Sequence, residues 1–143
     1  MKIAVDFDGT IVEHKYPEIG KPLLFAFETL RELQKQKHEI VLWTYRVGKE
    51  LDEAVAFCEQ NGIVFYAVNK NFPEEDFDNE TVSRKINADI YIDDRNVGGF
   101  PGWSKIWEML NQNDLQNTKQ ELKYVKEQIG EVSIWKRIFG RKE

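Results

Sequence analysis

Near its N-terminus the chain reads Ile3-Ala4-Val5-Asp6-Phe7-Asp8-Gly9-Thr10-Ile11-Val12. A short apolar run of this kind is typical of a β-strand buried on both faces, as found in parallel sheets. Two carboxylates, Asp6 and Asp8, follow the strand, and Gly9 then permits a tight turn. Because ligands of open α/β sheets bind at the carboxyl ends of the strands, we expect both carboxylates at the rim of a binding crevice.

The Asp8-Gly9 pair has a simpler interpretation, since Asp-Gly after an apolar run is also typical of a β-hairpin turn. Asp6 is not needed for such a turn, however, and a second acidic pair, Asp93 and Asp94, follows another short apolar run. Neighbouring carboxylates repel one another and lose solvation beside a packed core, and a divalent cation offsets both costs. The two acidic pairs therefore favour a metal site.

Composition sets broad limits on fold and function. The chain has 143 residues, 41% of them hydrophobic, which is enough for a domain with its own core. Its net charge of −5 argues against a protein that coats nucleic acid, so we expect no stable nucleic-acid binding. The single cysteine, Cys58, excludes an intrachain disulfide and a cysteine-based zinc cluster. Without a leader-like segment or a long apolar stretch, the protein is expected to be cytoplasmic, with no transmembrane segment.

Apolar spacing predicts alternating strands and helices after the first strand. Helices are expected from Pro22, from 48 to 61 with Cys58 in the core, and from Trp103; strands are expected over 39–43, 63–68 and 90–92. This alternation predicts a three-layer α/β/α fold with a mainly parallel, Rossmann-like sheet in strand order 3-2-1-4. The connections leave no room for a separate cap domain, and the polar segment 11–21 is expected to form a small flap over the crevice.

Further polar residues follow the later strands. Thr44 and Arg46 come after the second strand, and a hydroxyl beside a guanidinium suits an anion. They could equally be a helix cap and a surface ion pair. If the sheet is parallel, Asp6, Asp8, Asp93 and Asp94 converge at one edge with Thr44 between them. Four carboxylates in one place imply a hard, oxygen-seeking cation such as Mg²⁺.

These residues resemble the motifs of the haloacid dehalogenase superfamily of phosphohydrolases. Asp6-Phe7-Asp8-Gly9-Thr10-Ile11 matches its Asp-x-Asp-x-Thr signature, Thr44 fits its second motif and Asp93-Asp94 its fourth. The third motif requires a basic residue, for which Lys85 and Lys70 are the candidates. The string around Lys85 is similar to small capless members and favours it over Lys70. The resemblance covers residues 1–110.

The resemblance implies a Mg²⁺-dependent phosphomonoester hydrolase. Asp6 would attack phosphorus to form an aspartyl-phosphate, and Asp8 would act as general acid and then as general base. Asp6, the main-chain carbonyl of Asp8, and Asp93 would hold Mg²⁺, with Asp94 completing the outer shell or holding the lysine. Thr44 and the lysine would stabilise the transferring phosphoryl group.

The substrate is expected to be a small phosphorylated metabolite, a nucleotide or a phosphorylated polymer end. Candidate substrate contacts are the polar groups at the strand ends, namely Gly9, Thr10, Arg46, Asn69, Lys70 and Arg95. Two other classes of protein share some of these features. Signalling receiver domains also gather carboxylates, a Thr and a Lys around Mg²⁺, although in them the paired acids do not come last. A non-catalytic domain that binds phosphorylated ligands is the other alternative.

Residues 111–143 lie outside the resemblance. Leu115, Leu122 and Ile129 keep a seven-residue spacing, which predicts a helical extension that packs on the core or on a neighbouring subunit in a homo-oligomer. The final segment, 134–142, is aromatic and basic. We expect it to be a docking tail, with contact to a membrane surface or an anionic partner as the alternative.

Overall fold

The computed structural model describes residues 1–78, 80–112, 120 and 123–127. The chain divides into two units, Met1–Ser104 and Lys105–Glu143, so the division precedes the expected boundary at 110. The first unit contains the sheet and the residues discussed below. The heptad positions Leu115, Leu122 and Ile129 and the tail 134–142 lie outside the described residues. Among the described helices, none has both the length and the apolar character needed to cross a membrane.

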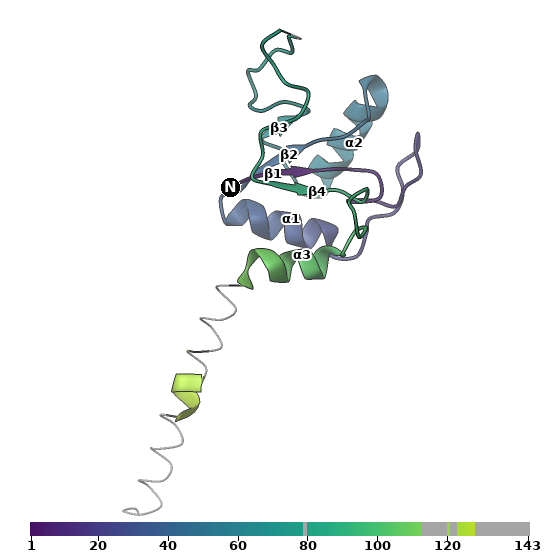
Figure 1. Ribbon diagram of the computed structural model, residues 1–143. Helices are drawn as coiled ribbons and strands as arrows, with labels where there is room; N and C mark the ends of the chain where they lie inside the picture. The colour runs from purple at the N-terminus through teal and green to yellow at the C-terminus, as the bar shows by residue number, and fades with distance from the viewer. Residues whose placement is uncertain (79, 113–119, 121–122, 128–143) are drawn as a thin grey trace, which may run out of the picture. The chain divides into compact units, whose positions relative to one another are not determined.

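The described strands form one parallel sheet (Figure 1). Its spatial order is β3 (Ala67–Val68), β2 (Glu39–Leu42), β1 (Lys2–Val5), β4 (Ile90–Ile92), so the predicted order is confirmed. Val5 pairs with Leu42 on one side and Ile92 on the other, which aligns the carboxyl ends of the three strands. The third strand is shorter than the expected 63–68, because only Ala67 and Val68 pair with β2.

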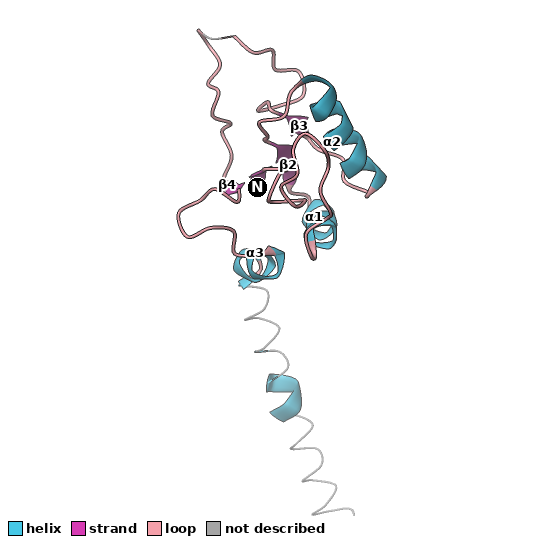
Figure 2. Ribbon diagram, turned by 90° about the vertical axis from the view of Figure 1, so that its right-hand side faces the viewer, coloured by secondary structure: helices cyan, strands magenta, loops and turns pink. Residues whose placement is uncertain are grey.

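Helices α1 (Ala26–Lys35) and α2 (Gly48–Gln60) connect β1 to β2 and β2 to β3. Both connections step across the sheet in the same direction, and right-handed crossovers therefore place both helices on one face, as Figure 2 shows. Their buried faces include Phe27, Leu30, Leu33, Ala54 and Cys58. Burial raises the pKa of the Cys58 thiol to about 12, as expected for a core residue. Helix α3 (Trp103–Leu110) begins at the predicted residue.

The prediction that the first helix begins at Pro22 is wrong. Pro22 instead forms an antiparallel bridge with Val12, and the Glu13 N–H donates to the Lys21 carbonyl at 2.8 Å. These contacts close the segment between them into the flap over 11–21. The helix starts only at Ala26, after a residue in the left-handed region.

The other face of the sheet is occupied by the irregular connection between β3 and β4, drawn as the loop on the opposite side of the strands from α1 and α2 in Figure 2. Its Ile86 is buried with Val41 and Ala67, and Trp43 and Ala88 pack against this cluster. The described part of this connection lacks a helix because its run of acids and a proline has no helical apolar spacing. The α/β fold with a parallel sheet and no separate cap domain is confirmed, with this connection as its third layer.

Candidate functional site

Three carboxylates meet where β1 and β4 end. Asp6 follows β1, and Asp93 and Asp94 follow β4; one oxygen of each lies within 4.8 Å of the others. The backbone supports this approach, since the Asp6 N–H donates to the Ile92 carbonyl at 2.9 Å. Residues that are 87 positions apart (93 minus 6) therefore share one site because their strands are neighbours.

Asp6, one of the three clustered carboxylates, has a clearly raised pKa. Burial, with smaller additions from the charges of Asp93 and Asp94, raises the pKa of Asp6 from 3.8 to about 7. Hydrogen bonds from the Phe7 backbone and from the Thr10 hydroxyl, 3.3 Å from Oδ2, act in the opposite direction. Near neutral pH the cluster thus attracts a positive charge, either a proton or a cation.

The environment of Asp94 tests whether a metal fits. Gly9 has a φ of +85°, and a Cβ at this position would lie 2.2 Å from Asp94 Oδ2. The turn after β1 therefore leaves room for this carboxylate only because it has no side chain. Asp94 Oδ1 is buried and has no hydrogen-bond partner among the described residues. A buried, unpartnered carboxylate oxygen beside two others is a donor set that fits Mg²⁺.

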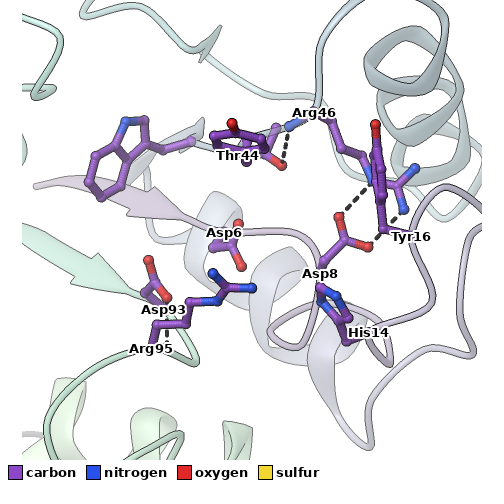
Figure 3. Close-up of a pocket in the computed structure, with 10 residues that line it drawn as sticks. Asp6, Asp8, His14, Tyr16, Thr44, Arg46, Asp93 and Arg95 are labelled. Carbon is purple, nitrogen blue, oxygen red and sulfur yellow. Dashed lines mark hydrogen bonds and ion pairs between the residues drawn. The ribbon is translucent and has the colours of Figure 1, made fainter.

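Asp8 does not join the cluster through its side chain. Its carboxylate forms a bidentate ion pair with Arg46, with Nε to Oδ2 and Nη2 to Oδ1 both at 2.7 Å. Four carboxylates were expected to converge, but only Asp6, Asp93 and Asp94 do so among the described residues. The fourth, Asp8, instead pairs with the buried guanidinium of Arg46. Asp8 still lines the same pocket as Asp6 (Figure 3).

Arg46 was a candidate substrate contact, but its guanidinium is held by the protein. Besides Asp8, it donates to the carbonyls of Pro17 and Glu18 in the flap, at 2.9 and 2.8 Å. The rings of Phe7 and Tyr16 lie 5.0 and 5.2 Å from it. The hydrogen bond that Arg46 donates to Asp8 is the main reason that the pKa of Arg46 is raised. Arg46 therefore joins the flap to Asp8.

A pocket of about 560 Å³ opens over these carboxylates (Figure 3). Arg95 lines it, and Figure 3 shows its guanidinium directed toward Asp6 and Asp8. Thr44 also lines it and accepts a hydrogen bond from the Arg46 N–H at 3.2 Å. The complete lining is Asp6, Asp8, His14, Tyr16, Trp43, Thr44, Tyr45, Arg46, Asp93 and Arg95.

Sequence reasoning missed the ring side chains of this lining. For His14, the position in the polar segment 11–21 predicts an exposed loop residue, and no role is predicted for Tyr16, Trp43 or Tyr45. A signal for them was present, because Tyr16 lies in the expected flap and the other two flank Thr44. Flap and strand-end residues both face the crevice, so aromatic residues there are candidates for ligand contact.

Neither candidate lysine lines the pocket. The Lys85 ammonium lies 5.4 Å from the centre of the Tyr91 ring, over the face of the sheet and before β4 begins. Lys70 is half-buried and follows β3. It lies near Glu75, whose pKa is lowered mainly by hydrogen bonds from Asn71 and to a smaller extent by the charge of Lys70. In this structure, therefore, neither lysine side chain reaches the pocket beside Asp93 where the resemblance would place it.

Three other predicted contacts support the site without lining the pocket. Asn69 accepts a hydrogen bond from the Thr44 N–H at 2.8 Å. Thr10 is fully buried between Asp6 and Trp103, whose indole N–H donates to its carbonyl at 2.7 Å. Gly9 provides the space for Asp94 described above.

Comparison with known proteins gives one match of high quality. The chain is 55% identical to a conserved protein coded by a locus of Bacteroides thetaiotaomicron, with a TM-score of 0.74, covering 79% of this chain and 91% of that one. The chain belongs to the family of that protein. No family model and no curated protein matches the chain.

The site shared between β1, β2 and β4 has the parts needed for chemistry on a phosphoryl group. It combines three clustered carboxylates that could hold a divalent cation, a further carboxylate paired with an arginine, and a hydroxyl and a cation at the pocket wall. The order of the parallel strands places these groups at one edge of the sheet.

Proposed function

We propose that the protein is a Mg²⁺-dependent phosphomonoester hydrolase that acts through an aspartyl-phosphate. The observation that carries the proposal is the Asp6, Asp93 and Asp94 cluster, in which a buried oxygen of Asp94 lacks a partner among the described residues. Such a cluster lowers the stability of the fold unless a cation binds it. It lies at the carboxyl edge of a parallel sheet, which is where α/β proteins of this kind bind their ligands.

The residues divide the reaction into two steps. An Asp6 oxygen forms a bond to phosphorus as the ester P–O bond breaks. Asp8 enters this step protonated, gives its proton to the departing oxygen and becomes the carboxylate that pairs with Arg46. Water then forms a bond to the same phosphorus, Asp8 takes its proton, and Asp6 leaves as a carboxylate with inorganic phosphate as product. Mg²⁺, held by Asp6, Asp93 and Asp94, would supply charge stabilisation and orient the phosphoryl oxygens.

The remaining groups position the reactants. Arg46 holds the Asp8 carboxylate in one orientation, with the flap carbonyls as its anchor. The Thr44 hydroxyl and the Arg95 guanidinium line the pocket beside Asp6 and are placed to bind phosphoryl oxygens. Arg95 thereby takes the role that the resemblance implies for a lysine.

The test is hydrolysis of p-nitrophenyl phosphate by the full chain in Mg²⁺ and in EDTA. We expect turnover that needs the metal and falls by at least about a thousandfold in Asp6→Asn, because the nucleophile is lost. Asp52→Asn, an exposed carboxylate on α2, is the matched control and should retain turnover.

Two results would contradict the proposal. Turnover that survives in Asp6→Asn would remove the nucleophile from the mechanism. No turnover, together with a stable phosphoprotein after treatment with small phosphodonors, would instead favour the receiver-like alternative.

A further inference from the structure

Ring side chains from two separate segments line the pocket beside the carboxylates. His14 and Tyr16 belong to the flap, and Trp43 and Tyr45 follow β2. We propose that the substrate is a phosphomonoester whose leaving group carries a planar ring, of the nucleobase or aryl kind, which these side chains contact. This inference rests on the proposed function and names its substrate class.

The exposure of these rings indicates a binding role. Tyr45 is 99% exposed and Tyr16 is 52% exposed, although both line the pocket. Single exposed aromatics are common, but several around one concave site are a feature of ligand pockets. A planar ring inserted there would cover ring surface that now faces water.

Two of the rings pack against other side chains of the protein. Tyr16 lies over the buried Arg46 guanidinium, 5.2 Å from its centre. Trp43 packs edge to face against Tyr91, with ring centres 5.2 Å apart. A wall that is held in place loses little freedom on binding, which favours a rigid planar ligand over a flexible one.

The charges indicate the orientation of such a substrate. Figure 3 shows Asp6, Asp8, Asp93 and Arg95 close to one another in the pocket, and the proposed function puts the phosphoryl group among them. The pocket volume of about 560 Å³ lies within the range of small-molecule sites, roughly 300–1,000 Å³, and exceeds what a phosphoryl group alone requires. The remaining space is bounded by the rings, so the leaving group contacts them.

The experiment compares adenosine 5′-monophosphate or uridine 5′-monophosphate with ribose 5-phosphate. In all three esters the phosphate is attached to the primary 5-hydroxyl of a ribose, so the departing oxygen is of the same kind and a difference reports on the base. We expect kcat/KM to be at least about tenfold higher for a nucleotide, mainly through KM, since base stacking on aromatic side chains commonly contributes this much. 2-Phenylethyl phosphate against 2-cyclohexylethyl phosphate extends the comparison to aryl rings and distinguishes them from nucleobases, since both esters release primary alcohols of similar acidity.

Variants test whether these rings cause the preference. Tyr45→Ala and Tyr16→Ala should each lower the ratio of nucleotide to ribose 5-phosphate kcat/KM severalfold. Phe72→Ala is the matched control, because Phe72 is 45% exposed and does not line the pocket. Tyr45 is solvent-exposed, so its variant should fold, which circular dichroism checks. A preference unchanged in both tyrosine variants would overturn the assignment.

Failure of the inference and failure of the proposed function are distinguishable. If the nucleotides and ribose 5-phosphate are hydrolysed with equal kcat/KM, and 2-phenylethyl and 2-cyclohexylethyl phosphate are also equal, the ring contact is wrong and the hydrolase stands. If none is hydrolysed, calorimetric binding of the same esters to Asp6→Asn decides the inference. Equal Kd values within each pair would overturn the inference, and tighter binding of the ester with the planar ring would support it.

Discussion

Asp6 is the residue at which stability conflicts with the proposed function. Its folded-state pKa of about 7 lies above the ordinary value of 3.8. The folded chain therefore holds this proton more tightly than the unfolded chain does, so metal-free stability falls as pH rises between these two values. A group that is costly for the empty fold but suited to a cation is typical of a functional site.

Replacing Asp6 should reverse this cost. In EDTA, Asp6→Asn should match the wild type near pH 4 and become more stable by pH 8, by at most about 4 kcal/mol, because asparagine cannot ionise. Urea unfolding at the two pH values measures this. A stability difference that does not change with pH would contradict the prediction, and Asp52→Asn provides the control for loss of an exposed charge.

Arg46 shows how much depends on one buried side chain. Arg46→Lys keeps the charge but loses the bidentate pair with Asp8 and the fork of hydrogen bonds to the flap. Removing one partner of a buried pair costs about 3–5 kcal/mol, and we expect unfolding free energy to fall toward that range. Lys49→Met, which removes an exposed pair with Glu53, should change it by no more than about 0.5 kcal/mol. Equal effects in both variants would show that the Arg46 pair is unimportant.

Arg95 and Lys85 can be separated by the same phosphatase assay. Of Arg95, Lys85 and Lys70, only Arg95 lines the pocket. Arg95→Ala should therefore lower kcat/KM by about a hundredfold or more, as expected when a charged group beside a transferring phosphoryl group is lost. Lys85→Ala and Lys70→Ala should change it by less than about threefold. A larger loss in Lys85→Ala than in Arg95→Ala would restore the lysine that the resemblance implies.

At the scale of elements, the site depends on two strand-end loops in contact. The loop after β1 has a glycine where the loop after β4 places a carboxylate. Neighbouring parallel strands make this meeting unavoidable, and the absent Cβ makes it sterically allowed. The connection between β3 and β4 contributes differently, since Ile86 anchors it on the sheet with Val41 and Ala67.

Gly9→Ala tests the contact between the two loops. The new Cβ would collide with Asp94, so we expect the carboxylate to move and Mg²⁺ affinity to fall by about tenfold or more. Gly98→Ala is a matched control, because Gly98 also has a positive φ but open space around its Cβ position. It should show the backbone strain without the loss of affinity. Titration calorimetry compares the two, and equal affinities would contradict the prediction.

At the scale of the whole molecule, cation binding should be visible as stability. A cation that binds only the folded chain stabilises it by about 2.7 kcal/mol at a hundred times its Kd. We expect Mg²⁺ to raise the thermal midpoint, and more at pH 8 than at pH 5, because protons compete for Asp6 at the lower pH. Scanning calorimetry with and without Mg²⁺ measures this, with Asp94→Asn as the variant that loses the effect. An unchanged midpoint at both pH values would argue against a metal site.

Local patterns account for the correct parts of the sequence prediction. The apolar runs ending in Asp6 and Asp93 predict buried parallel strands, and the helical spacing of residues 48–61 predicts α2 almost to the residue. The start of α1 was wrong because Pro22 pairs with Val12 in the flap, a contact between segments that no local pattern contains. The third strand was too long because pairing with β2 begins only at Ala67.

By itself, the sequence determined the parallel sheet, the order of its strands and the gathering of acids at one edge. Burial of apolar runs and the handedness of their connections depend only on local pattern and chain topology. The tertiary structure alone decided that Arg46 holds Asp8, that Arg95 and not a lysine lines the pocket, and that Gly9 makes room for Asp94. These pairings join side chains that are distant in the chain, and their positions follow from how the flap and the strand-end loops pack in three dimensions.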